Sequence, residues 1–151
     1  DQYGLAQAAI GQGRLLMTPA HLALIVGAIA NDGVAVKPRL VIGEEPERLA
    51  RVMPVDQARP LQRMMRQVVN QGTARGIDMP GLAIAGKTGT AQNSDGAPHS
   101  WFVGYAPADR EVPEQTLAIA VLVEQAGYGS AAAAPLARDL LLRAQQLGLL
   151  P

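Results

Sequence analysis

The pattern of apolar and polar positions predicts helices in the first half of the chain and strands in the second. Residues 19–31 are apolar around nearly the whole circumference of a helix, so we expect a helix buried on several sides, with His21 as a hydrogen-bonded core residue. A Thr-Pro pair before it supplies an N-cap and a first helical residue. Residues 34–42 predict a short extended pair or edge segment, and the charged residues 43–54 predict a surface excursion.

The second predicted helix, residues 57–71, is amphipathic. Asp56 has the residue type of its N-cap. The apolar residues expected on its inner face are Leu61, Met64 and Val68. The residues expected on its solvated outer face, which we do not interpret as a polyanion site, are Arg59, Arg63 and Arg66.

Three strand candidates follow, at residues 82–91, 100–106 and 116–124. The short, turn-rich loops between them favour antiparallel neighbours, and the alanines on one face of the third strand allow a helix to pack closely. A last helix lies within residues 131–147, and its predicted inward residues are Leu136, Leu140 and Leu147. The predicted fold class is therefore α+β: an antiparallel three-stranded portion of a sheet, covered by the C-terminal helix, with the helix at residues 19–31 belonging to a neighbouring helical region.

Composition narrows the classes of function. The chain is 48% hydrophobic and 17% charged with a net charge of zero, which predicts a buried core and neither a nucleic-acid nor a membrane-surface partner. No apolar run is long enough to span a membrane, and residues 1–10 do not resemble a signal peptide, so we expect a soluble segment with any anchor outside it. Because the chain has no cysteine and His21 and His99 lack metal-ligand spacing, we expect no disulfide, no metal and no cofactor.

The most informative stretch is Gly-Lys-Thr-Gly-Thr at residues 86–90, which follows an apolar run. It places one of the two lysines of the chain at the end of a buried strand, where an ammonium needs an anion as its partner. Residues 81–88 also match the phosphate-loop pattern G-x-x-x-x-G-K-[ST]. That loop requires a strand before its first glycine and a helix after its lysine, whereas here a turn precedes Gly81, and glycines and a proline follow.

We therefore expect a strand and no nucleotide site, with Lys87 and Gly89 on one face and Thr88 and Thr90 on the other, beside an open groove. Glycines at 86 and 89 would let another backbone approach closely. An edge strand of this kind can accept an extended peptide, and its amides can stabilise an oxyanion. The plain alternative is a lysine that only discourages edge-to-edge aggregation.

Residues 87–90, Lys-Thr-Gly-Thr, resemble the third signature motif of the penicillin-binding proteins and serine β-lactamases. The similarity extends over essentially the whole chain and is typical of class B penicillin-binding proteins, the peptidoglycan D,D-transpeptidases. The other segments that carry it are residues 10–13 (Ile-Gly-Gln-Gly), 16–19, 29–33, 71–74 (Gln-Gly-Thr-Ala), 85–92 and 99–107. The resemblance implies that residues 1–151 are the C-terminal portion of one transpeptidase domain.

In such a domain a serine, activated by a lysine one helical turn away, attacks the D-Ala-D-Ala amide of a peptidoglycan stem peptide. An amine from a neighbouring strand resolves the acyl-enzyme, and β-lactams acylate the same serine. The resemblance implies that Lys87 and Thr90 are catalytic, Lys87 through its positive field and Thr90 through its backbone amide in the oxyanion hole. It implies that Thr88, Gly89 and Thr90 bind the substrate or drug, the two hydroxyls holding its carboxylate.

The implied partners are the stem peptide, β-lactams and the remainder of the domain. The implied location is the extracytoplasmic face of the bacterial plasma membrane, with an N-terminal anchor outside this chain.

The chain departs from the family pattern because it has no Ser-x-x-Lys and no Ser-x-Asn. Val34 stands three residues before Lys37, Ile84 stands three before Lys87, and residues 94–96 come closest to Ser-x-Asn without matching it. We expect both motifs in the N-terminal portion of the domain, so the segment alone is expected to be inactive. The alternatives are a D,D-carboxypeptidase or β-lactamase, which uses water as acceptor, and a non-catalytic β-lactam-sensing or scaffold domain.

Three other residues near the motif have simpler interpretations. His99 is expected to be a capping or surface residue, and Trp101 to pack on the sheet. Tyr128, in a glycine-rich loop after the third strand, is a candidate for the border of the groove.

Overall fold

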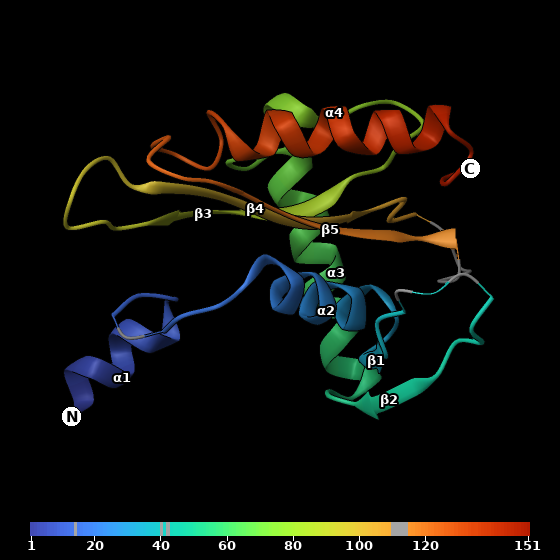
Figure 1. Cartoon of the computed structure of the whole chain (residues 1–151), viewed down its shortest axis with the longest axis horizontal. Coiled ribbons are helices and arrows are strands. Elements are labelled where there is room, and N and C mark those ends of the chain that lie inside the picture. The colour runs from blue at the N-terminus through green and yellow to red at the C-terminus, as the bar shows by residue number, and fades with distance from the viewer. Residues whose placement is uncertain (14, 40, 42, 110–114) are drawn as a thin grey trace.

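The structure, a computed structural model, describes residues 1–13, 15–39, 41, 43–109 and 115–151. In chain order its elements are α1 (Gln2–Ala9), α2 (Pro19–Ala30), β1 (Val34–Val36), β2 (Arg48–Arg51), α3 (Val55–Asn70), the 3-10 turn η1 (Arg75–Ile77), β3 (Ala85–Ala91), β4 (His99–Ala106), β5 (Leu117–Val123) and α4 (Ala133–Gln146). The antiparallel sheet, ordered β3–β4–β5, lies between α4 on one face and α2 on the other, and α3 packs against β3 (Figure 1). The predicted fold class and the three-stranded antiparallel sheet are confirmed.

The register of the sheet decides which side chains share a face. β3 and β4 pair without a shift, so Lys87 lies beside Val103 and Gly89 beside Trp101. Thr88 lies beside Phe102, which belongs to the apolar core on the α4 side of the sheet. Lys87 and Gly89 therefore share the face turned toward α2, as the alternation predicted.

The predicted strand at residues 82–91 is strand only from Ala85 onward. Ala83 has a positive φ of 42°, a conformation that no regular strand allows, although residues 82–84 are as buried as strand residues.

The glycines of β3 are approached in two different ways. A Cβ on Gly86 would lie 2.3 Å from the Phe102 ring and 2.7 Å from the Val103 carbonyl oxygen, so the expected close approach of another backbone is present there, together with an aromatic side chain. A Cβ on Gly89 would instead meet the Trp101 side chain at 3.1 Å, and the close backbone contact at this position depends on Gly129 having no Cβ. A Cβ on Gly129 would be 2.6 Å from the Gly89 carbonyl oxygen, so the loop after β5 presses directly on the strand that carries Lys87.

The inner face of α4 consists of alanines and one leucine. Its buried residues are Ala133, Ala134, Ala137, Leu141 and Ala144. The stripe predicted from its larger residues is wrong, because Leu136, Leu140 and Leu147 are 44%, 48% and 60% exposed. The alanines let the helix lie close to the sheet, and this close approach turns the longer side chains outward.

Helix α2 packs on β5 through small residues, as predicted. A Cβ placed on Gly27 would lie 3.5 Å from that of Ala118. The helix is nevertheless only partly buried, since Val26 and Ala28 are its buried residues within this chain. His21 is exposed, so its assignment to the core was wrong: it lies in the first turn, where its backbone N–H donates to the Thr18 hydroxyl at 3.1 Å.

Helix α3 begins at Val55 after Pro54, so Asp56 lies in its first turn and is not its N-cap. Its buried residues are Ala58, Met65 and Val69, while Met64 is 52% exposed; the predicted stripe was therefore rotated by about one residue.

Two of the arginines of α3 make ion pairs. The predicted outward position of Arg66 is wrong, because its guanidinium donates to the Ile84 carbonyl at 2.9 Å and to Asp78 at 2.8 Å. Arg59 is exposed as expected and pairs with Asp32 at 3.1 Å.

The segment predicted as a surface excursion contains a strand. All four residues of β2 are exposed, and the strand pairs with β1 in a separate two-stranded ribbon. The predicted extended segment at residues 34–42 is strand only over β1, and its residues 40 and 42 lie outside the described residues.

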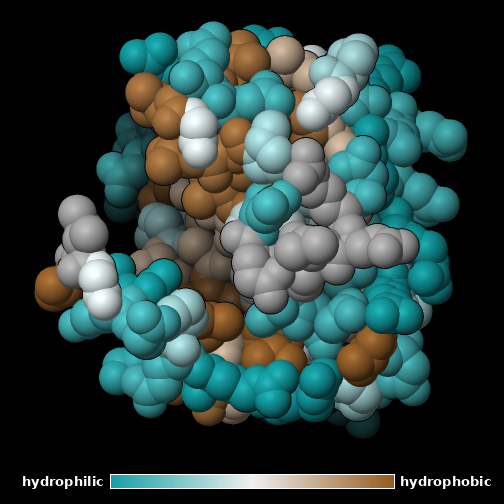
Figure 2. Space-filling view, turned by 90° about the vertical axis from the view of Figure 1, so that its right-hand side faces the viewer, coloured by the Kyte–Doolittle hydropathy of each residue, from teal (hydrophilic) through white to brown (hydrophobic). Residues whose placement is uncertain are grey.

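Apolar side chains remain exposed on the helices of both faces of the sheet and on the sheet itself. They include Ile25 on α2, Leu117 on β5, and Leu136 and Leu140 on α4. Seen from the end where the C-terminus lies, hydrophobic residues gather in the upper left of the surface (Figure 2). Within the described part of the chain, no helix has the length and apolar character needed to cross a membrane.

Candidate active site

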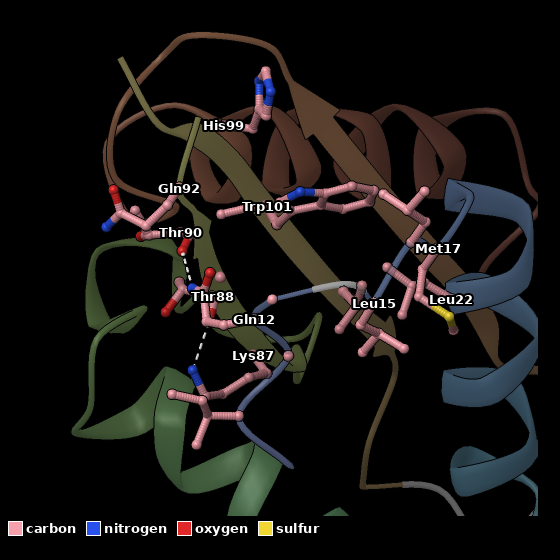
Figure 3. A pocket seen from close by; sticks show the side chains of 17 residues that line it. Gln12, Leu15, Met17, Leu22, Lys87, Thr88, Thr90, Gln92, His99 and Trp101 are labelled. Carbon is pink, nitrogen blue, oxygen red and sulfur yellow. Dashed lines mark hydrogen bonds between the residues drawn. The ribbon is translucent and has the colours of Figure 1, made fainter. Parts of the chain in front are cut away.

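A pocket of about 750 Å³ opens along β3 on the face of the sheet turned toward α2. One wall consists of residues 87–91 of β3 and the following Gln92, together with His99, Trp101 and Val103 of β4. The opposite wall consists of residues 10–13 and 15–17 and of Leu22 on α2. In Figure 3, Trp101 extends from the sheet toward Met17, and Lys87 lies at the other end of the pocket.

Lys87 is an exposed side chain on a strand and not the first residue of a helix. Its ammonium donates to the carbonyl of Thr88 at 2.5 Å (Figure 3). The strand and the turn around residues 81–82 are incompatible with a phosphate loop, in which a helix must begin at the lysine. The expected strand beside an open groove is therefore present, and the nucleotide-binding alternative is excluded.

The free edge of β3 presents backbone groups of Thr88 and Thr90 to the pocket. The carbonyls of both residues accept hydrogen bonds from side chains outside the β3–β4 ladder, Thr88 from Lys87 and Thr90 from Gln12 at 3.1 Å. In a strand, the N–H and C=O of one residue point to the same side, so the N–H of Thr90 faces the same edge. At this edge, the carbonyls of Thr88 and Thr90 are therefore bonded to side-chain donors. The N–H of Thr90 faces the same edge and can donate to a negatively charged oxygen.

The hydroxyl of Thr88 is paired with a residue that the sequence interpretation assigned no role. Thr73, between α3 and η1, lies 2.7 Å from it, oxygen to oxygen. Thr88 is only 9% exposed, so this pair fixes its side chain. The signal for Thr73 was the resemblance of residues 71–74 to the family, although the sequence alone does not say which residue it touches.

The three neighbouring residues take different places. His99 lines the pocket, and its Nδ1 accepts a hydrogen bond from the backbone N–H of Gln125 at 3.1 Å, so it also anchors the loop after β5. Trp101, which was expected to pack on the sheet, forms part of the pocket wall. Tyr128 is 73% exposed and is not among the residues that line this pocket.

Ser100 is the serine closest in the sheet to the Lys-Thr-Gly-Thr motif, and its hydroxyl has a structural role. Its side chain is fully buried, donates to the Tyr128 carbonyl and accepts from the Ala133 N–H, both at 3.0 Å. These bonds attach the start of α4 to β4, on the opposite face of the sheet from Lys87. Ser100 therefore has neither the exposure nor the position of a nucleophile for this pocket.

Tyr105 and Asp32, neither of which lines the pocket, have shifted pKa values. Burial raises the pKa of Tyr105 to about 12, and its hydroxyl has no hydrogen-bond partner among the described residues. A hydrogen bond from Arg59 lowers the pKa of Asp32, and further bonds to the Gln62 amide tie the end of α2 to α3.

A family model described as the penicillin binding protein transpeptidase domain matches residues 2–142. This chain belongs to the penicillin-binding protein transpeptidase family. The chain is 33% identical over 171 residues to the peptidoglycan D,D-transpeptidase PbpA of Mycolicibacterium smegmatis, a match that covers 98% of this chain and 33% of that protein. It is 34% identical over 150 residues to the peptidoglycan D,D-transpeptidase MrdA of Acinetobacter baumannii, covering 82% of this chain and 22% of that protein.

The solved structures give the same result for this transpeptidase-family chain. Its fold superposes on penicillin-binding protein A of Mycobacterium tuberculosis, in an imipenem acyl-enzyme complex, with a TM-score of 0.83 and 29% identity. That match covers 97% of this chain and 34% of that structure. The chain thus spans about a third of the length of PbpA relatives.

Proposed function

We propose that residues 1–151 form the C-terminal portion of the transpeptidase domain of a peptidoglycan D,D-transpeptidase, which cross-links stem peptides through a serine acyl-enzyme and is acylated by β-lactams. The observation that carries the proposal is Lys87 on the edge of β3, facing a pocket, with the N–H of Thr90 at the same edge. The family membership and the acyl-enzyme complex of the M. tuberculosis protein support the same reaction class.

In this proposal the chain supplies the electrostatic half of the site. The Lys87 ammonium stabilises negative charge at the reacting centre and takes part in proton handling, and the Thr90 N–H forms half of the oxyanion hole. Thr88 and Thr90, which both line the pocket at the edge of the strand, hold the ligand carboxylate by their hydroxyls, and Thr73 orients that of Thr88. The nucleophilic serine, its activating lysine and the Ser-x-Asn motif belong to the N-terminal portion of the same domain, so the segment alone is inactive.

The exposed apolar residues of α2, β5 and α4 support a second part of the proposal. Exposed apolar surface is a feature of interaction faces, and we assign these residues to contact with the remainder of the domain. The substrates are D-Ala-D-Ala stem peptides at the extracytoplasmic face of the bacterial plasma membrane, where an anchor outside this chain would hold the protein. A D,D-carboxypeptidase would share every feature of the site and would differ in accepting water in place of an amine.

The decisive test is fluorescent-penicillin labelling of the transpeptidase that contains this chain. Lys87→Ala is expected to lower the second-order acylation rate constant by at least about 100-fold, the usual effect of removing one electrostatic stabiliser of an oxyanion. The matched control is Lys37→Ala, because the only other lysine of the chain lies exposed on the β1–β2 side, paired with Glu47 at 2.7 Å.

Lys37→Ala is expected to leave the rate constant unchanged. Equal labelling of the Lys87 variant and the wild type would refute the assigned role, and a wild type that forms no covalent adduct would refute the enzyme itself. Adding a D-amino acid as acceptor then distinguishes transpeptidation from carboxypeptidation. A transpeptidase forms the exchanged peptide, whereas a carboxypeptidase releases only D-alanine.

A further inference from the structure

One segment singled out in the sequence has no role in the proposed reaction: residues 10–13, between α1 and α2. Its central residue, Gln12, reaches across the pocket and donates its side-chain amide to the Thr90 carbonyl at 3.1 Å (Figure 3). Gln12 and Thr90 are 78 residues apart in sequence, and the bond is partly buried. It joins the two walls of the pocket at Thr90, whose N–H lies at the same free edge of β3.

The Thr90 carbonyl is the acceptor that an extended ligand would use. A peptide that adds to a sheet edge pairs its own N–H groups with the outward carbonyls of the edge strand. The donor nitrogen of such a bond lies about 2.9 Å from the oxygen, in the plane of the sheet, and the added strand lies about 4.8 Å from the edge. The Gln12 amide already donates to this oxygen at 3.1 Å, so a ligand N–H would compete with Gln12 for the same acceptor.

The backbone around Gln12 suits a side chain that moves. Gly11 and Gly13 flank it with φ values of 77° and 75°, in the left-handed region that favours glycine. A Cβ on Gly11 would meet no atom within 4 Å, so this side of the turn is not packed against the rest of the protein. The Gln12 backbone N–H donates to the Gln7 carbonyl at 2.8 Å, which anchors the turn to α1, while the Gln12 side chain is held at the edge of β3 by its own hydrogen bond.

We propose that Gln12 is a specificity-determining gate, which covers the Thr90 carbonyl in the empty site and must exchange places with an amide N–H of the incoming ligand. The proposal rests on the proposed function, since it concerns ligands that acylate this site. A ligand with an amide N–H next to its reactive carbonyl replaces the bond that it breaks. A ligand without that N–H leaves the Gln12 bond in place.

The test uses the transpeptidase that contains this chain and compares two β-lactams. Benzylpenicillin has an acylamino N–H, whereas imipenem has a hydroxyethyl group at the equivalent position. Gln12→Met keeps the length of the side chain and removes its donor. It is expected to increase the acylation rate constant for benzylpenicillin by about two- to tenfold, the effect of one net hydrogen bond, and to leave that for imipenem unchanged.

The matched control is Gln2→Met, the same chemical change on the exposed first residue of α1, which is expected to affect neither ligand. An equal change for both ligands in the Gln12 variant would show that Gln12 only shapes the pocket, and a slower reaction with benzylpenicillin would show that it assists binding; either result overturns the gate. A wild type that reacts with neither ligand would instead overturn the proposed function.

Discussion

Lys87 and Thr88 are consecutive residues whose side chains lie on opposite faces of the same strand edge. Both residues line the pocket at this edge, and the Thr88 hydroxyl is fixed by Thr73. The same edge carries the backbone groups of Thr90, whose carbonyl is bound by Gln12. At the scale of single residues, the site therefore combines one cation, one outward N–H and hydroxyls whose positions are set by partners distant in sequence.

The buried hydroxyl of Tyr105 leads to a prediction about stability. The side chain is 3% exposed, and its oxygen has no partner among the described residues. Tyr105→Phe is therefore expected to increase the free energy of unfolding by about 1 kcal/mol, because the cost of burying an unpaired hydroxyl disappears. Urea unfolding at pH 8 measures this, with the exposed Tyr128→Phe as the neutral control.

The Tyr105→Phe substitution also tests how the stability of the protein depends on pH. Burial raises the pKa of Tyr105 from 10.0 to about 12, so the folded state holds this proton more tightly than the unfolded state. Its contribution to stability is complete below pH 10 and is lost as the pH rises from 10 to 12, by roughly 2 kcal/mol. The Tyr105→Phe variant is expected to lack this part of the loss of stability at alkaline pH. Parallel curves of unfolding free energy against pH for the variant and the wild type would contradict the assignment.

At the scale of elements, the position of α4 depends on small residues at its inner face and on Ser100 beneath its first turn. The hydroxyl of Ser100 joins β4 to the N–H of Ala133, where the helix begins. Gly129 lies just before this point, against the backbone of Gly89. The C-terminal helix and its preceding loop thus support the strand that carries Lys87 from behind.

Neighbouring leucines of α4 provide a matched pair for testing this packing. Leu141 is fully buried against the sheet, whereas Leu140 is 48% exposed. Leu141→Ala is expected to lower the free energy of unfolding by about 2–5 kcal/mol, the cost of a core cavity, and Leu140→Ala by less than about 1 kcal/mol. Equal losses in denaturant unfolding would mean that the helix presents a different face to the sheet.

At the scale of the whole molecule, the two faces of the sheet have separate roles. The face toward α4 holds the larger apolar core, which includes Phe102 and Leu141. The face toward α2 holds a smaller cluster around Val26 and Tyr105 and, farther along the same strands, the pocket. Stability is concentrated on one side, so the other side can remain open for a ligand.

The division of the domain predicts the behaviour of the isolated chain. The purified 151-residue chain is expected to form no covalent adduct with benzylpenicillin, because it has no Ser-x-x-Lys and Ser100 is buried on the other face of the sheet. Intact-protein mass spectrometry measures this directly. An adduct on any serine of this chain would contradict the assignment of the nucleophile to the N-terminal portion.

The sequence by itself determined the type and order of the main elements and the strand that carries Lys87. These features follow from local patterns, because side-chain alternation and the glycines and prolines of the turns act within a few residues. It also indicated the family, because the motifs are contiguous.

Only the tertiary structure decided which face of each helix is buried, and which residues meet at the site. Leu136 and Leu140 of α4 face outward because alanines allow a closer approach to the sheet, and Arg66 faces inward because the Ile84 carbonyl lies beside it. The contacts of Gln12 with Thr90 and of Thr73 with Thr88 join segments far apart in the chain. No local pattern specifies such contacts, since they depend on how the packed layers bring distant backbone groups together.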